Sequence, residues 1–217
     1  MQTQRSRESE PPGGPPTGRR DAVRNYHRIL AAARDVLGEA GAEASIEDIA
    51  VRAGVGVGTV YRRFTSKEAL IDELLRLVLD DLLVAADDAL TRAEGDGIEA
   101  FLRAIGRSFG EHARYANLLL QRPTDPAVAR RIRAAIDTLT TRAIAAGTLS
   151  ADATTGDVLA LIWGMRGLVQ ATGDVAPESW QRFLDIHLTG LRAEAPISRT
   201  PALSARQLSR LAPGRGA

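Results

Sequence analysis

The sequence predicts an all-α protein of about nine helices, divided between a small N-terminal domain and a larger C-terminal domain. Three observations support this fold class. Apolar residues recur at steps of three and four along most of the 217-residue chain, capping residues and glycine stops divide the pattern into segments of helical length, and no segment alternates convincingly as a strand would. A chain of this length can bury a sizeable hydrophobic core.

Two helices are predicted first. The segment from Arg20 to Gly41 has an apolar stripe at helical spacing, and Gly41 is suited to end it. A short helix follows at about residues 45–53. Ser45 is its expected N-cap, because the Ser45 side chain can accept a hydrogen bond from the amide of Asp48 and acidic residues fill the first turn.

A third helix and a long fourth helix are predicted after Gly54, which supplies a turn. The third helix covers about residues 57–64. In the sequence TSKE that follows, Thr65 is the expected cap and Glu68, three residues on, completes a capping box. The fourth helix extends to about Ala93, because its apolar stripe is continuous.

Further helices are expected at about residues 97–114, 126–146, 156–171 and 178–193. Their boundary signals are the capping pair Asp96 and Glu99, Asp125 before Pro126, the stop at Gly147, and Thr154 with Asp157. Residues 1–18 are predicted to form a disordered arm and residues 194–217 a disordered tail, because proline, glycine and charged residues leave little to bury. Between them we expect a three-helix domain at 19–66 and a helical domain at 67–193.

Composition excludes several kinds of site. The chain has no cysteine, and its three histidines are too scattered for a metal cluster, so neither a metal nor a cofactor is expected. No catalytic residue is assigned, because Gly-x-Ser-x-Gly and phosphate-loop motifs are lacking. The N-terminus lacks an export-type apolar region, and the longest apolar run, Val158 to Met165, is shorter than the roughly 18 residues of a membrane span. We therefore expect a cytoplasmic protein without membrane contact.

The formal net charge of +1 conceals an asymmetry. Residues 1–67 carry eleven basic and eight acidic side chains, a balance of +3, which leaves −2 for residues 68–217. A basic excess in the N-terminal domain is typical of a surface that faces a polyanion.

The stretch AGVGVGTVYRRF, at residues 53–64, contains three glycines and two arginines. A dinucleotide-binding loop is disfavoured, because the glycines are not spaced as G-x-G-x-x-G and they follow a helix instead of a strand. A helix-turn-helix fits better, because it needs two short helices joined by a tight turn. In helical projection Val57, Val60 and Phe64 form an inner face, whereas the outer face carries hydrogen-bond donors and little bulk.

This outer face and its surroundings predict the contacts with DNA. Arg20, together with Arg19, is expected in the minor groove, and Ser45 and Lys67 are expected at helix N-termini that attract phosphate. Gly58 is the expected point of close approach, and Thr59 and Tyr61 are expected to donate hydrogen bonds to phosphate oxygens. Arg62 and Arg63 are expected to contact guanine edges or phosphates. For the two arginines ahead of the first helix, a merely solvated position is an equally good interpretation.

Residues 45–70, SIEDIAVRAGVGVGTVYRRFTSKEAL, resemble the DNA-binding signature of the TetR family of bacterial one-component regulators. Arg63 departs from the pattern, since many members carry histidine or tyrosine there. The resemblance implies a homodimer on a palindromic double-stranded DNA operator, usually a repressor, with a small-molecule effector bound in the C-terminal domain. A ligand-independent DNA-binding regulator or activator is the alternative.

Two sets of residues in the C-terminal domain are predicted to serve these functions. The dimer interface is expected on the last two helices, at Ile162, Gly164, Gly167, Leu168, Trp180, Phe183, Leu184 and His187. The effector pocket is expected at Phe101, Ile105, Phe109, His112, Tyr115, Trp163, Met165 and Arg166. Both sets have a simpler interpretation as core residues of one chain.

Overall fold

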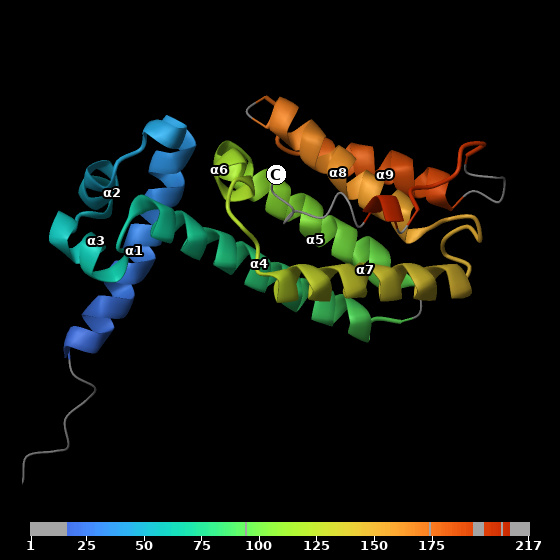
Figure 1. The fold of residues 1–217 in the computed structure, drawn as a ribbon, viewed down its shortest axis with the longest axis horizontal. Coiled ribbons are helices and arrows are strands. Elements are labelled where there is room, and N and C mark those ends of the chain that lie inside the picture. The colour runs from blue at the N-terminus through green and yellow to red at the C-terminus, as the bar shows by residue number, and fades with distance from the viewer. Residues whose placement is uncertain (1–16, 94, 174, 193–197, 205, 209–217) are drawn as a thin grey trace, which may run out of the picture.

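In the computed structural model, which describes residues 17–93, 95–173, 175–192, 198–204 and 206–208, the regular elements are all helical (Figure 1). They are α1 (Thr17–Ala40), the 3-10 helix η1 (Gly41–Glu43), α2 (Ile46–Ala53), α3 (Val57–Arg63), α4 (Lys67–Thr91), α5 (Asp96–His112), the 3-10 helix η2 (Ala113–Tyr115), α6 (Ala116–Leu120), α7 (Pro126–Ala145), α8 (Thr155–Thr172) and α9 (Ser179–Leu191). The predicted fold class is confirmed. Within the described ranges, no helix is both long and apolar enough to span a membrane.

The first three helices gather at one end of the molecule, and α4 runs from them toward the second group of helices (Figure 1). Their apolar stripes meet in one hydrophobic core, because each stripe faces inward at the spacing of three and four residues. Its deeply buried side chains include Ile29, Leu37, Ile49, Val60, Leu70 and Leu74. Burial of each such side chain contributes about 1.5–3 kcal/mol. This core holds α3 in place through the buried face of that helix.

Three predicted helix caps are confirmed. The amide of Asp48 donates to Ser45 Oγ at 3.0 Å at the start of α2. The amide of Asp157 donates to Thr154 Oγ1 at 3.3 Å at the start of α8, where the same two residues complete a capping box. Asp125 likewise caps α7. These bonds are local in sequence, which is why the residue order alone predicts them.

Two predicted caps are displaced by one residue. Ser66, and not Thr65, caps α4, since the amide of Ala69 donates to Ser66 Oγ at 3.1 Å. Asp96 is already the first residue of α5 and therefore not its cap. The preceding Gly95 has a φ of 94°, a left-handed backbone that glycine tolerates without strain.

The helix predicted at 97–114 ends early, and a short helix that sequence reasoning missed follows it. α5 stops at His112, and the chain continues through η2 into α6. The physical reason is that the residues on the two sides of this break are buried in different hydrophobic cores. Phe101 and Ile105 on α5 are buried in the second core, whereas Tyr115 and Leu119 are buried in the first one. The segment from η2 to α6 therefore joins the two groups of helices.

The second core lies between the C-terminal part of α4 and helices α5, α7, α8 and α9. Its most deeply buried side chains include Phe101, Leu102, Val158, Met165, Leu184 and Leu188. Helix α9 approaches α5 so closely that a Cβ placed on Gly106 would lie 2.2 Å from the ring of Trp180. Glycine at this position is required by the packing.

Residues 198–204 and 206–208 correct the prediction of a disordered tail from residue 194. Leu208 is buried in the second core, and Leu203 packs against the same core. Ser204 caps this last turn, because the amide of Gln207 donates to Ser204 Oγ at 3.3 Å. The Leu203 carbonyl oxygen lies 2.8 Å from where a Cβ on Gly156 would stand. The other residues of the predicted tail, and residues 1–16 of the predicted arm, lie outside the described residues.

Candidate functional site

The turn between α2 and α3 depends on one glycine conformation. Gly54 ends α2 with a φ of 62°, and the amide of Val55 donates to the Ala50 carbonyl at 3.0 Å. A guanidinium nitrogen of Arg28 on α1 donates to the Gly54 carbonyl at 3.2 Å. The turn is thus held both by its own backbone and by α1.

Helix α3 has one buried and one exposed face, arranged as its sequence predicts. Val60 and Phe64 are buried in the first core. Tyr61 is 47% exposed. A Cβ placed on Gly58 would meet nothing within 4 Å, so the backbone there is open to an approaching surface. The exposed face therefore combines a flat backbone region with polar side chains, which is what close contact with a duplex requires.

A groove of about 350 Å³ lies between α1 and α3, beside this exposed face. It is lined by Asp21, Ala22, Asn25, Tyr26, Ile29, Thr59, Arg62 and Arg63. Arg62 donates to Thr59 Oγ1 at 3.1 Å, which aligns two predicted contact residues. The guanidinium carbon of Arg63 lies 4.7 Å from the centroid of the Tyr26 ring, a cation–π geometry.

Tyr26 lies on the apolar stripe of α1 and packs against the first core, but its polar end also has a partner. Its hydroxyl donates to Glu73 on α4, and Arg76 donates to the two oxygens of that carboxylate at 2.8 and 2.9 Å. The Arg76 guanidinium lowers the pKa of Glu73 to about 2. Burial, and then the neighbouring Glu73, raise the pKa of the Tyr26 hydroxyl. Glu73 is therefore a fixed anion that anchors Tyr26.

Of the other predicted DNA contacts, Ser45 has the partner that its predicted cap requires, whereas Lys67 and Arg20 have a partner or a position that the sequence did not indicate. The Ser45 hydroxyl is engaged in the cap of α2. Lys67 Nζ donates to the carbonyls of Ala42 at 2.6 Å and Ala44 at 3.0 Å, so it ties the start of α4 to η1 and to the residue after η1. Arg20 lies inside α1, which begins at Thr17, and this corrects the prediction that it precedes the first helix.

The predicted effector residues divide between the two cores. Phe101, Ile105 and Met165 are buried in the second core. Tyr115 belongs to the first core, although its ring meets that of His112 edge-on with centroids 5.7 Å apart. Burial raises the pKa of Tyr115 to about 12. Phe109 and Trp163 also pack against the second core, so Tyr115 is the one of these apolar residues that belongs to the other core.

Tyr115 and Arg166 each have a buried polar atom, the hydroxyl oxygen and Nε respectively, without a hydrogen-bond partner among the described residues. The guanidinium therefore retains a donor that the fold leaves free. Gln170, one turn further along α8, donates to Asn117 of α6 at 3.1 Å. This part of α8 consequently faces the segment that joins the two cores.

The predicted dimer residues also separate into two kinds. Trp180 and Leu184 are buried within the chain, which corrects their assignment to an interface. Gly164 faces the chain's own Phe183, since a Cβ there would lie 2.8 Å from that ring. In contrast Gly167 is open. On α9 the rings of Phe183 and His187 lie in contact, with centroids 3.9 Å apart and planes tilted by 32°, and His187 is exposed.

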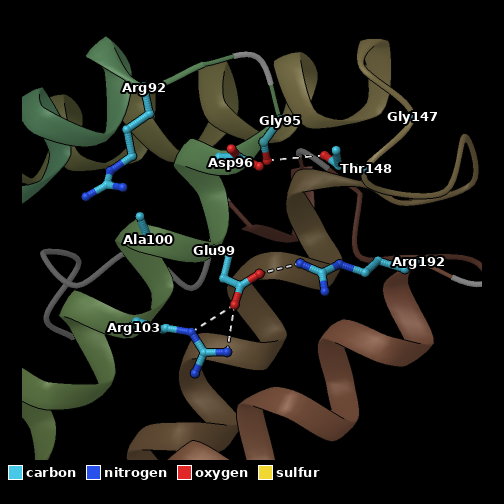
Figure 2. A pocket seen from close by; sticks show the side chains of 9 residues that line it. All are labelled: Arg92, Gly95, Asp96, Glu99, Ala100, Arg103, Gly147, Thr148 and Arg192. Atoms are coloured by element: carbon cyan, nitrogen blue, oxygen red, sulfur yellow. Dashed lines mark hydrogen bonds and ion pairs between the residues drawn. The ribbon is translucent and has the colours of Figure 1, made fainter.

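A second hollow, of about 610 Å³, lies where α4, α5 and α9 end or begin (Figure 2). It is lined by Arg92, Gly95, Asp96, Glu99, Ala100, Arg103, Gly147, Thr148 and Arg192. Glu99 accepts hydrogen bonds from Arg103 at 2.6 and 2.9 Å and from Arg192 of the chain after α9. Burial raises the pKa of Glu99, but the two guanidiniums together lower it by more, so the pKa stays below its usual range. The network binds α9 to α5, and none of the predicted site residues belongs to it.

Two family models match this chain. Residues 29–74 match the bacterial regulatory proteins of the tetR family, and residues 95–193 match the C-terminal domain of SbtR-like transcriptional regulators. Among curated proteins, the HTH-type transcriptional regulator SAR0097 of Staphylococcus aureus (strain MRSA252) is 38% identical over 74 residues, 33% of this chain. The match spans 39% of the length of that relative.

Solved structures are similar over most of the chain. The TetR transcriptional regulator SCO0520 from Streptomyces coelicolor has a TM-score of 0.58 and 29% identity, over 78% of this chain and 99% of that one. The TetR transcription regulatory protein from Mycobacterium vanbaalenii has a TM-score of 0.58 and 28% identity, over 81% of this chain and 99% of that one. The helix-turn-helix geometry, the two family matches and these structures agree that the chain belongs to the TetR family of transcriptional regulators.

Proposed function

We propose that this protein represses transcription by binding a palindromic DNA operator as a homodimer, and that a small-molecule effector releases it. The exposed face of α3 carries the proposal. Gly58 is open, Tyr61 is largely exposed, and Arg62 is aligned by Thr59. A helix presented in this way fits the major groove, where bidentate arginine contacts distinguish guanine from other bases.

The dimer is proposed to form through the exposed side of α9 together with α8. Phe183, Ile186, His187 and Gly190 follow one another at steps of three, one and three residues and share one face of α9. Ile186 is 56% exposed, and Gly190 is open. An exposed apolar and aromatic stripe of this kind is typical of an isologous interface, in which each chain contributes the same surface.

The effector is proposed to bind beside Arg166 on α8. A buried guanidinium N–H without an acceptor costs about 1–3 kcal/mol, so a carboxylate or another anionic group on the effector would be stabilised there. The bond between Gln170 and Asn117 joins α8 to α6, and α6 belongs to the first core through Leu119. An effector that displaces α8 therefore displaces the helices that carry α3, which shifts the population away from the DNA-binding arrangement.

The DNA-binding part is tested by selecting bound duplexes from a random pool at near-physiological salt. We expect an enriched palindrome. Arg62→Ala should relax the base preference at one position of each half-site, by about 1–3 kcal/mol of discrimination. Arg107→Ala, an exposed arginine on α5, is the matched control and should leave the motif unchanged. Recovery of salt-sensitive binding without any motif would instead indicate a non-specific DNA-binding protein.

The effector and dimer parts are tested separately. A thermal-shift screen of anionic metabolites should find compounds that raise the melting temperature, because binding at a hundred times Kd stabilises the native state by about 2.7 kcal/mol. Such a compound should lower operator affinity, and Arg166→Gln should abolish its effect. Sedimentation equilibrium should show a dimer for the wild type and a monomer for Ile186→Asp. A wild-type monomer at operator-binding concentrations would contradict the proposed assembly.

A further inference from the structure

Tyr26 contacts two helices that have different tasks in the proposed function. Its ring lies beneath the guanidinium of Arg63, at the end of α3, with 4.7 Å between the guanidinium carbon and the ring centroid. Its hydroxyl donates to Glu73 on α4. One side chain of α1 therefore connects a candidate DNA contact with the long helix that leads to the second domain.

The position of Arg63 is set by this ring. Arg63 is exposed, and it lines the groove of about 350 Å³ between α1 and α3. A long exposed side chain samples many rotamers unless a partner restricts it. The Tyr26 ring supplies that restriction, because a guanidinium stacked on an aromatic face keeps its in-plane donors free for a phosphate or a base.

The ring itself is fixed from two sides. It stacks on Phe64 with centroids 6.2 Å apart and an interplanar angle of 23°. The hydroxyl is fixed by Glu73, whose carboxylate is held by Arg76. Phe64 sets the plane of the ring, whereas Glu73 ties it to α4.

Asp72, the residue next to Glu73 on α4, is bound to the segment that follows α6. Asp72 accepts two hydrogen bonds from Arg122, at 2.5 and 2.9 Å, and Arg122 lies just after α6. Two consecutive carboxylates on α4 are thus bound to different elements, Glu73 to α1 and Asp72 to the segment after α6. A movement of α4 that follows Arg122 would change the distance between Glu73 and Tyr26.

We propose that Tyr26 is a positioning residue for DNA binding, which holds Arg63 in the groove between α1 and α3 and makes its orientation depend on α4. The inference rests on the proposed function, since it assigns a role within operator binding. It predicts that the contribution of Arg63 to operator affinity disappears when the Tyr26 ring is removed, and weakens when only the hydroxyl is removed.

The test is a double-mutant cycle measured by fluorescence anisotropy, with the duplex recovered from the selection as probe. Tyr26→Leu removes the ring, Tyr26→Phe removes only the bond to Glu73, and each is made alone and together with Arg63→Ala. We expect Tyr26→Leu to weaken binding roughly twofold to fivefold, the size of an exposed cation–π contact, and to have no further effect when Arg63 is already replaced. Tyr26→Phe should give a smaller loss that Glu73→Gln reproduces.

Three results would overturn the inference alone. Additive losses from Tyr26→Leu and Arg63→Ala would show that Tyr26 only supports the core. Unchanged affinity of Tyr26→Leu, with a normal melting temperature, would show that Arg63 needs no support. If the Tyr26→Leu variant does not fold, the Tyr26→Phe variant is used in its place, because it keeps the stack on Phe64. Operator affinity of Tyr26→Phe equal to that of the wild type would contradict the proposed link between Tyr26 and α4. If the wild-type chain binds no duplex, the proposed function fails together with the inference. Failure of the inference alone is thus distinguishable from failure of the proposed function.

Discussion

Replacing Gly54 by alanine is expected to lower the free energy of unfolding by about 2 kcal/mol, because a left-handed backbone costs a residue with a Cβ roughly 1–2 kcal/mol. Gly54 has a φ of 62°. The new Cβ would also lie 2.6 Å from a guanidinium nitrogen of Arg28, so that side chain must move. Loss of its bond to the Gly54 carbonyl adds about 0.5–1 kcal/mol.

The melting temperature of the Gly54→Ala variant should therefore fall by about 4–8 °C, as expected for a chain of this size. Circular dichroism during heating measures this shift, and urea titration measures the free energy. Gly58→Ala is the matched control, because Gly58 lies inside α3 and its Cβ would meet nothing within 4 Å. Its stability should rise slightly, since alanine is the better helix former.

The same pair of variants separates stability from contact with DNA. Gly58→Ala adds a methyl group to the face of α3 that is proposed to contact the duplex. Inserting such a group into a packed contact costs about 1–3 kcal/mol, so operator Kd should rise by at least roughly fivefold. Wild-type affinity of Gly58→Ala would refute the placement of α3 in the groove, and an unchanged melting temperature of Gly54→Ala would refute the strain argument.

Three further predictions concern other parts of the chain. The pKa of Glu73 is lowered from 4.5 to about 2 in the folded state, so its stabilising effect is present above pH 4.5 and is lost as the pH falls toward 2. In the Glu73→Gln variant the free energy of unfolding should therefore depend less on pH between these values. Leu208→Ala should lower the free energy of unfolding by about 2–5 kcal/mol, whereas Val175→Ala, at a 92% exposed residue, should not alter it. Lys67→Met should lower the melting temperature and, if its contacts are purely internal, leave the salt dependence of operator binding unchanged.

The sequence predicts well what depends on neighbouring residues. The cap of α2 at Ser45 and the inner face of α3 at Val60 involve residues three or four positions apart, and both are confirmed. The cap of α4 was displaced by one residue because Thr65 and Ser66 are chemically equivalent caps, and only the backbone conformation selects between them.

Features that depend on distant parts of the chain were not predictable in this way. Nothing in the local pattern around Tyr115 indicates that it is buried against α1 instead of the second core. Leu208 is an isolated apolar residue between polar neighbours, and only its burial in the second core, which distant residues form, explains its position. The contact between Arg63 and Tyr26 joins residues 37 positions apart, so spacing alone could not reveal it.

The break between α5 and α6 has a consequence for how such regulators can diversify. The first core is completed by Leu70 and Leu74 of α4 and by Tyr115 and Leu119. A boundary at residue 66 therefore cuts through this core, and a fragment of residues 19–66 would expose apolar surface to water. Under the proposed effector response, recombination between relatives must preserve the shape and polarity of residues 113–120. The proposed effector-binding helices can then vary freely only on the far side of this segment.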